Sequence, residues 1–154
     1  MASAFRILVI NGPNLARLGT RQPEIYGTKT LDDVVDELSE QAAASGAEIH
    51  ARQSNHEGDL IDWIGGAEDE KFAGIVFNPG AYTHTSYALY DAICGTTVPV
   101  VETHISNPEA REPFRAESRV APACLGKVAG FGVNSYRLAL LALLDHLRAA
   151  SAQS

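Results

Sequence analysis

Short apolar runs recur along the chain, and longer amphipathic stretches separate them. A short run rich in branched side chains and bounded by glycine, proline or asparagine is typical of a buried strand. The second run alternates apolar and polar residues instead, as a half-buried edge strand does. We therefore expect strands at residues 7–10, 47–53, 74–77, 98–101 and about 127–131.

Apolar positions at helical spacing predict helices between these strands. Thr30 is placed to cap the first helix, which Gly46 ends. The run Ser54-Asn-His-Glu57 resembles a capping box and should open the second helix. Further helices are expected at residues 83–93, at a short segment that begins with Pro108, and at residues 134–148.

Strands and helices alternate along the whole chain, which indicates a parallel sheet with helices on both faces. Five strands suit a doubly wound, flavodoxin-like α/β fold of order 2-1-3-4-5, in a single domain over residues 1–154 with an ordered core of about 5–148. Ligands of such folds bind beyond the carboxyl ends of the strands, between strands 1 and 3. The polar clusters after strands 1, 3 and 4 should therefore converge, and the turn after strand 2 should lie to one side.

The acidic composition narrows the range of partners. A net charge of -7 and a pI near 5.1 argue against nucleic acid or an anionic membrane, although arginines gathered at one place can still bind an anion. Cys94 and Cys124 fit no metal or redox spacing and are expected to be buried, reduced thiols. The longest apolar run, Leu138 to Leu144, is far shorter than a membrane span, and the first strand begins too early for a signal peptide. We therefore expect a cytoplasmic protein.

An irregular segment, residues 11–27, follows the first strand. It carries Arg17, Arg21 and Tyr26 among several glycines, and a loop of this length in a small domain is often a functional lid. Such a lid would bring positive charge and a phenol over a pocket. Because loop arginines are mostly solvated, the residues alone favour a functional lid and a merely solvent-exposed loop about equally.

The segments after the third and fourth strands carry candidate histidines. His104 alone would more often be structural, but Glu102 lies two residues earlier and so on the same side of an extended chain. A carboxylate there orients the imidazole and favours its protonated form, so His104 can act as an acid near neutral pH. The backbone N–H groups of Ile105 and Ser106 offer donors to an anion. His84 is equally well explained as a helix cap.

Several kinds of site are disfavoured. The chain has neither G-x-G-x-x-G nor a P-loop, which argues against a nucleotide, and no G-x-S-x-G elbow, which argues against a serine hydrolase. Its five histidines are scattered, which argues against a metal. The residues indicate a small enzyme that works without a cofactor and uses tyrosine, histidine and arginine on an anionic, hydroxylated small molecule.

Four blocks of the sequence resemble the type II 3-dehydroquinate dehydratases, in the same order and over roughly residues 5–147. They are Asn11-Gly-Pro-Asn-Leu with Leu18-Gly, Arg21-x-Pro23 and Tyr26-Gly27; Gln53-Ser-Asn-His-Glu-Gly58; Asn78-Pro-Gly-Ala-Tyr-Thr-His-Thr-Ser86; and Glu102-Thr-His-Ile-Ser-Asn107 with Arg111 and Arg115. Gly130-Phe-Gly132 and Tyr136 complete the resemblance. Gln22 and Lys127 depart from the family pattern, where glutamate and an apolar residue are usual, but neither has an assigned chemical role.

The resemblance implies a flavodoxin-like dodecamer of four trimers that needs no cofactor. It implies conversion of 3-dehydroquinate to 3-dehydroshikimate and water, by anti elimination through an enolate, in the shikimate or a quinate pathway. Tyr26 resembles the base that takes the proton from carbon 2, and Arg21 the lid arginine that keeps this tyrosine anionic. Asn14 would position a water against the enolate oxygen. His104, oriented by Glu102, would protonate the departing hydroxyl.

The same resemblance assigns the groups that bind the substrate. Asp91 is expected to act in a neighbouring subunit's site, because it lies seven residues after His84, about two turns along the expected helix, and so too far away to share that pocket. Arg17 and Arg111 receive no role. The carboxylate would be held by Asn78 with the backbone of Ile105 and Ser106, and the ring hydroxyls by His84, Arg115 and the neighbour's Asp91.

Two alternatives stay open. A non-catalytic flavodoxin-like module that binds a small carboxylate would need Arg115 but neither Tyr26 nor the Glu102–His104 pair. A Schiff-base dehydratase catalyses the same reaction with a lysine beside the substrate ketone. The lysines of the chain lie outside the expected clusters, at Lys29, Lys71 and Lys127.

Overall fold

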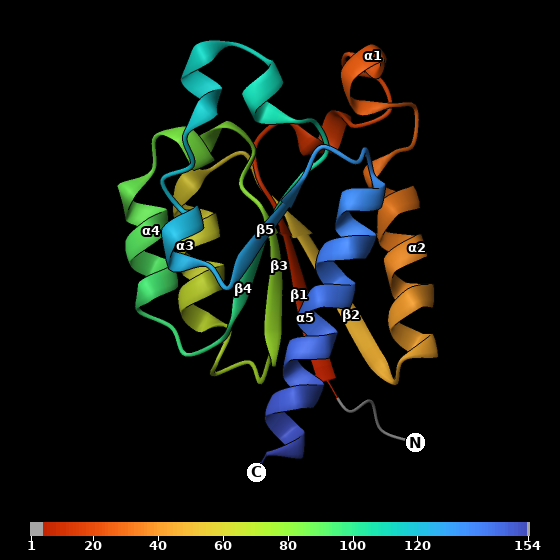
Figure 1. The fold of residues 1–154 in the computed structure, drawn as a ribbon, viewed down its shortest axis with the longest axis vertical. Coiled ribbons are helices and arrows are strands. Elements are labelled where there is room, and N and C mark those ends of the chain that lie inside the picture. Colours follow the sequence, from red (N-terminus) through yellow and green to blue (C-terminus); the bar gives the residue numbers. More distant parts are fainter. Residues whose placement is uncertain (1–4, 154) are drawn as a thin grey trace.

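A five-stranded parallel sheet forms the centre of the molecule. The computed structural model describes residues 5–153. The strands lie in the order β2-β1-β3-β4-β5, and neighbouring strands are parallel (Figure 1). This arrangement confirms the predicted flavodoxin-like α/β fold. The strands are β1 (Phe5–Asn11), β2 (Ala47–Gln53), β3 (Gly74–Asn78), β4 (Val100–His104) and β5 (Gly126–Ala129).

Helices cover both faces of the sheet. The helices α2 (Leu31–Ala44) and α5 (Asn134–Ala152) lie on one face, and α3 (Glu57–Gly66) and α4 (Tyr87–Cys94) lie on the other (Figure 1). The end of α5 at Ala152 lies beyond the predicted end at residue 148. The shorter elements are α1 (Pro23–Tyr26), η1 (Leu15–Arg17), η2 (Gly80–His84), η3 (Pro108–Ala110), η4 (Pro113–Ala116) and η5 (Ala121–Ala123).

The interior strand β1 explains why some apolar runs of the sequence are continuous. Ile7 and Val9 pack with residues of α2 and α5, whereas Leu8 and Ile10 pack with residues of α3 and α4. All four side chains are completely buried. A strand covered on both faces has no solvent side on which polar residues are tolerated. The sheet is thereby held between two apolar layers, with its strand ends fixed in position.

The capping predictions for the first two helices have different outcomes. Thr30 accepts a hydrogen bond from the N–H of Asp33, and Asp33 accepts one from the N–H of Thr30, so α2 begins as predicted. The prediction for Ser54 is wrong. Its hydroxyl accepts from the N–H of His56 and donates to Asp59, and α3 begins only at Glu57.

The helix predicted at residues 83–93 also begins later than expected. Gly80–His84 forms the separate 3-10 helix η2, and α4 begins at Tyr87. Ser86 is the cap, because its hydroxyl accepts from the N–H of Leu89 (2.9 Å). His84 and Asp91 therefore lie on different helices, and the sequence argument that placed them along one helix axis is wrong.

The segment after β1 has more structure than the sequence predicted. It contains η1 and α1, and the side chains of Leu15 and Leu18 are buried in the core between the sheet and α2. Gln22, one of the departures from the family pattern, adopts a left-handed conformation (φ 41°) immediately before α1. The first half of the segment is thus anchored, and α1 carries Tyr26 above it.

The two cysteines differ from each other. Cys124 is partly buried, and burial raises the pKa of its thiol to about 12. Cys94 is exposed, so the prediction that it is buried is wrong. Within residues 5–153, no helix combines the length and the hydrophobicity that crossing a membrane requires.

Candidate active site

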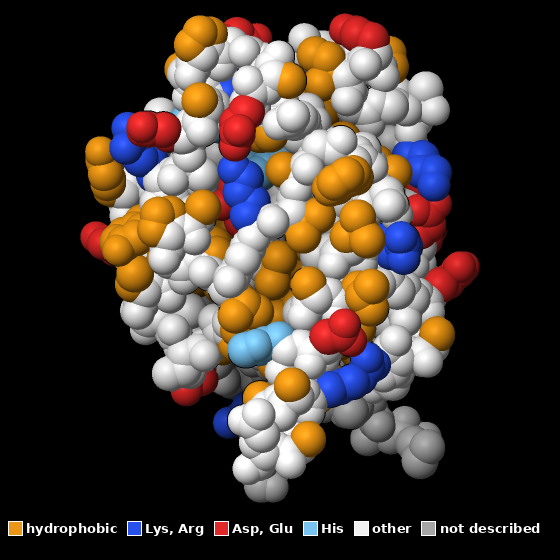
Figure 2. Space-filling model, in the orientation of Figure 1, with side chains coloured by type: hydrophobic (Ala, Val, Ile, Leu, Met, Phe, Trp, Pro, Cys, Tyr) orange, Lys and Arg blue, Asp and Glu red, His pale blue; other side chains and the backbone are white. Residues whose placement is uncertain are grey.

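A cleft lies beyond the carboxyl ends of β1, β3 and β4. It is bounded by α1 on one side and by the segment after β4 on the other, and a notch separates these two parts at the top of the space-filling view (Figure 2). The clusters after strands 1, 3 and 4 therefore converge as predicted. The predicted residues that line the cleft are Asn14, Arg21, Tyr26, Asn78, His84, His104, Ile105, Ser106 and Arg115.

The turn after β1 is held tightly against β3. The N–H of Gly12 donates to the carbonyl of Asn78 (2.8 Å), and a Cβ at position 12 would lie 2.5 Å from the carbonyl oxygen of Pro79. Only glycine fits so close an approach. Asn14 follows in a left-handed conformation (φ 68°), with its N–H donating to Oδ1 of Asn55 (3.0 Å). Asn55 belongs to the turn after β2, which lies beside the cleft as predicted and supports Asn14.

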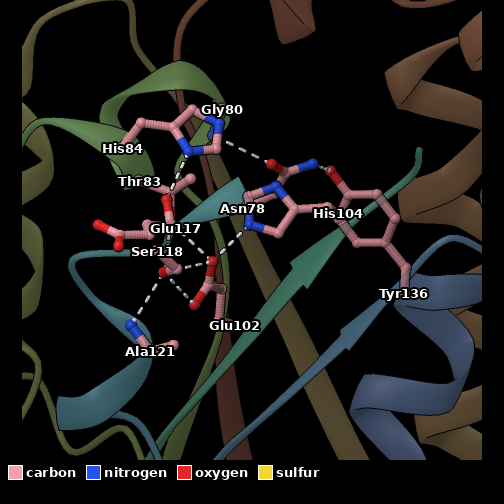
Figure 3. A network of polar contacts seen from close by, with 10 residues as sticks. All are labelled: Asn78, Gly80, Thr83, His84, Glu102, His104, Glu117, Ser118, Ala121 and Tyr136. Atoms are coloured by element: carbon pink, nitrogen blue, oxygen red, sulfur yellow. Dashed lines mark hydrogen bonds and ion pairs between the residues drawn. The ribbon is translucent and has the colours of Figure 1, made fainter. Parts of the chain in front are cut away.

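The predicted pair of Glu102 and His104 is present at the end of β4. Nε2 of His104 donates to Oε2 of Glu102 (2.5 Å), and both side chains are buried (Figure 3). The same carboxylate accepts hydrogen bonds from the hydroxyls of Thr83 (2.6 Å) and Ser118 (2.9 Å). This arrangement fixes the imidazole and leaves Nδ1 as the ring nitrogen available to a ligand.

The hydrogen bonds around Glu102 decide its charge. Burial acts to raise the pKa of this carboxyl, but the hydrogen bond and the positive charge of His104, with the hydroxyls of Thr83 and Ser118, outweigh it and hold the pKa below its usual value. Glu102 is therefore an anion at neutral pH. An anion in this position accepts the hydrogen bond that orients the His104 ring.

Asn78 ends β3 and is nearly completely buried at the base of the cleft. Its Nδ2 donates to the hydroxyl of Tyr136 (2.8 Å), and its Oδ1 accepts from the N–H of Gly80 (3.1 Å) (Figure 3). The side chain therefore has one defined orientation. Its remaining N–H group is suited to an anionic ligand in the cleft.

Tyr26 lies under two guanidinium groups. Nη1 of Arg111 donates to the hydroxyl oxygen of Tyr26 (2.9 Å) and to the hydroxyl of Ser106 (3.1 Å). The guanidinium carbon of Arg21 lies 5.0 Å from the centre of the Tyr26 ring. Arg111 received no role from sequence reasoning, although it belongs to the fourth family block. A contact between two separate loops leaves no spacing signal that could have revealed it.

His84 and Arg115 form the outer wall of the cleft. Nδ1 of His84 lies 2.8 Å from the carbonyl of Glu117, which makes Nδ1 the donor and Nε2 the free acceptor in the neutral ring. Desolvation lowers the pKa of His84, only partly offset by this hydrogen bond. Arg115 pairs with Glu112 and lies over the ring of Phe114. A neutral acceptor beside a cation suits the hydroxyl groups of a ligand.

Two predicted site residues do not line this cleft. Glu102 lies behind His104 and acts through it. Asp91 is exposed on α4 and makes no part of the lining within its own subunit. Arg17 is also exposed and outside the lining.

The positive charges of the cleft all come from arginine among its described lining residues. These are Arg21, Arg111 and Arg115, so the arginines are gathered at one place. The lining contains no lysine, whose amine a Schiff-base mechanism would need.

Comparisons with known proteins agree on one family. The model of the family described as "Dehydroquinase class II" matches residues 5–144. A 3-dehydroquinate dehydratase of Halalkalibacterium halodurans is 55% identical over 139 residues, which cover 90% of this chain and 95% of that protein. A 3-dehydroquinate dehydratase of Rhodopseudomonas palustris strain TIE-1 is 54% identical over 148 residues, which cover 96% of this chain and 98% of that protein. The crystal structure of a type II dehydroquinase from Butyrivibrio crossotus superposes with a TM-score of 0.88 at 44% identity. The match covers 90% of this chain and 97% of that one.

Proposed function

The chain belongs to the type II dehydroquinase family, and on this premise we propose how its cleft carries out the reaction. The chain dehydrates 3-dehydroquinate, a step of the shikimate pathway. The C2–H and C1–O bonds break, a C1=C2 double bond forms in conjugation with the ketone, and the hydroxyl leaves as water. In our proposal the electrons of the C2–H bond move first onto the ketone oxygen. The resulting enolate then expels the C1 hydroxyl from the opposite face.

Tyr26, as the phenolate, is the base that removes the proton from carbon 2. The contact with Arg111 and the nearby guanidinium of Arg21 support this role, because neighbouring positive charge stabilises a phenolate. Asn14 positions a water against the enolate oxygen. Its backbone, held by Asn55, is rigid enough for a group that must meet developing charge without rearrangement.

His104, held by the Glu102 carboxylate, protonates the departing hydroxyl. The observation that carries the whole proposal is that two polar pairs each bring a reacting group to the same cleft: Tyr26 held by Arg111, and His104 held by Glu102. The first pair provides a base and the second an acid. A module that only binds a carboxylate needs neither pair.

The remaining groups bind the substrate. Asn78 and the backbone N–H groups of Ile105 and Ser106 hold the carboxylate. His84 and Arg115 hold the ring hydroxyls, for which the neutral Nε2 of His84 is a suitable acceptor. No lysine lines the cleft within the described residues, which supports elimination without an imine.

We further propose that the chain works in the cytoplasm as a dodecamer of four trimers, with Asp91 completing the cleft of a neighbouring subunit. Asp91 is exposed on α4, and Tyr87 of the same helix is 66% exposed, so this helix presents both an acidic group and an aromatic surface. The exposed thiol of Cys94 suits a reducing compartment. Native mass measurement of the purified protein tests the assembly: a monomer at working concentration would contradict it.

Incubation of the purified protein with 3-dehydroquinate tests the proposed function. The product is a conjugated enone, so its formation is followed by ultraviolet absorbance and its identity by mass. We expect absorbance to rise in metal-free buffer without added cofactor. A folded protein that binds 3-dehydroquinate but leaves the absorbance unchanged would instead be a binding module.

A further inference from the structure

Tyr136 reaches from α5 into the base of the cleft, although the steps above do not use it. Its side chain is completely buried. Its hydroxyl donates to Oδ1 of Asn11 (2.6 Å) and accepts from Nδ2 of Asn78 (2.8 Å). Figure 3 shows the ring extending from α5 toward Asn78. One phenol thus connects a helix with the ends of β1 and β3, next to a residue of the proposed carboxylate site.

The direction of these hydrogen bonds is fixed at the β2 end. Nδ2 of Asn11 donates to the backbone carbonyl of Arg52 (3.3 Å), and a carbonyl can only accept. Asn11 must therefore turn its Oδ1 toward Tyr136. The single proton of the Tyr136 hydroxyl is consequently donated to Asn11, and only a lone pair is left for Asn78.

The direction is fixed in the same sense at the η2 end. The backbone N–H of Gly80 donates to Oδ1 of Asn78 (3.1 Å), and an N–H can only donate. Asn78 must therefore turn its Nδ2 toward Tyr136, which has a lone pair to accept from it. The four hydrogen bonds from Gly80 to Arg52 form one continuous relay, and the orientation of both side-chain amides follows from its two backbone ends.

The relay matters because Asn78 would bind the substrate carboxylate poorly if its side-chain amide were reversed. Nδ2 carries two N–H groups, and one remains for the cleft after the other is donated to Tyr136. A reversed amide would present Oδ1 to the substrate carboxylate and repel it. We propose that Tyr136 is a positioning residue that, together with the backbone N–H of Gly80, holds the Asn78 amide with an N–H toward the carboxylate of 3-dehydroquinate. This inference rests on the carboxylate-binding role proposed for Asn78.

The ionisation of Tyr136 is consistent with this role. Burial raises the pKa of Tyr136 well above its usual value, and the hydrogen bond from Asn78 offsets only part of the effect. The hydroxyl therefore keeps its proton at neutral pH. A neutral Tyr136 contributes direction to the relay but no charge.

Tyr136→Phe tests the proposal because it removes the hydroxyl and keeps the ring in the core. Asn78 should then lose its hydrogen bond to the charged carboxylate of the substrate. We expect KM for 3-dehydroquinate to rise about tenfold to a hundredfold, the range for losing such a bond, with little change in kcat. Ser135→Ala is the matched control. It deletes a neighbouring buried hydroxyl, which accepts from the N–H of Phe131 (3.0 Å), and should leave KM unchanged.

A double-mutant cycle separates positioning from general damage. If Tyr136 acts through Asn78, adding Tyr136→Phe to Asn78→Ala should raise KM no further than Asn78→Ala alone. Independent, multiplying effects would overturn the proposal, as would an unchanged KM in Tyr136→Phe or an equal rise in Ser135→Ala. Should Tyr136→Phe fail to fold, Asn11→Ala interrupts the same relay from the other side and should raise KM likewise; an unchanged KM there would also overturn it.

The wild-type protein distinguishes the two levels of the argument. If it fails to convert 3-dehydroquinate, the proposed function is wrong. If it converts 3-dehydroquinate while the variants behave otherwise than stated, the relay alone is wrong.

Discussion

The hydroxyl oxygen of Tyr26 lies 2.9 Å from Nη1 of Arg111, which is 85 positions further along the chain. The same nitrogen donates to Ser106, so one guanidinium connects α1 with the segment after β4. Arg21, the arginine that the sequence singled out, lies over the Tyr26 ring instead. The direct partner of the proposed base is therefore Arg111.

Arg111→Ala should lower kcat about tenfold to a hundredfold, because a hydrogen bond to a charged group contributes about 1.5–3 kcal/mol. Arg111→Lys should recover part of the activity, since it keeps the charge but not the planar geometry. Arg148→Ala removes a guanidinium from the distant part of α5 and should leave kcat unchanged. Wild-type turnover by Arg111→Ala would show that this contact plays no part in the reaction.

His104→Ala should lower kcat at least about a hundredfold, the lower range for losing a positioned acid. His50 pairs with Glu48 on β2, and His146 is exposed on α5, so both lie outside the cleft lining. His50→Ala and His146→Ala should therefore turn over normally in the same assay. Equal losses in all the variants would point to a general effect on folding.

The buried carboxylate of Glu102 should make the fold sensitive to acid. Although burial acts against them, hydrogen bonds led by that of His104 hold the pKa of Glu102 in the folded state below the value of about 4.3 of a free glutamate. The unfolded chain then binds more protons, so this contribution to stability is present above about pH 4.3 and is lost as the pH falls through the folded pKa.

Glu102→Gln keeps the shape of the side chain and removes this titration. Its free energy of unfolding should therefore fall less than that of the wild type between about pH 6 and about pH 3.5. Urea denaturation at both pH values measures the difference. Parallel losses in the two proteins would mean that Glu102 does not contribute to the acid sensitivity.

Asp91 should act in a site other than that of its own subunit. Asp91→Asn and Tyr26→Phe proteins, each nearly inactive, would be unfolded together and refolded as mixed oligomers. Some clefts would then combine an intact Tyr26 from one chain with an intact Asp91 from another, and activity should partly return. Mixed oligomers confirmed by native mass but without activity would rule out the shared site.

The architecture was predictable because its causes are local and repeated. The apolar run at Ile7–Ile10 is continuous since β1 is covered on both faces, and the alternation of strands and helices admits few topologies. The rule that ligands bind beyond the strand ends then brought together Asn14, Asn78 and His104. Glu102 and His104 were predicted to meet from their spacing alone.

The sequence predictions were wrong where more than one residue could cap the same helix. Thr83 and Ser86 are both acceptable caps, but the hydroxyl of Thr83 is used by the buried Glu102, and Ser86 caps α4 instead. The contact between Arg111 and Tyr26 and the relay through Tyr136 join distant segments. No periodicity records such contacts, so only the folded chain reveals them.

The role of Tyr26 as the base is the central claim, and the turnover of Tyr26→Phe tests it most directly. This variant loses only the phenolic oxygen to which Arg111 donates. We expect kcat to fall at least about a hundredfold, since no other group in the proposal takes the proton from carbon 2. Circular dichroism and native mass of the same sample distinguish loss of the base from loss of the fold or of the assembly. Near-normal conversion of 3-dehydroquinate by folded Tyr26→Phe would contradict the account.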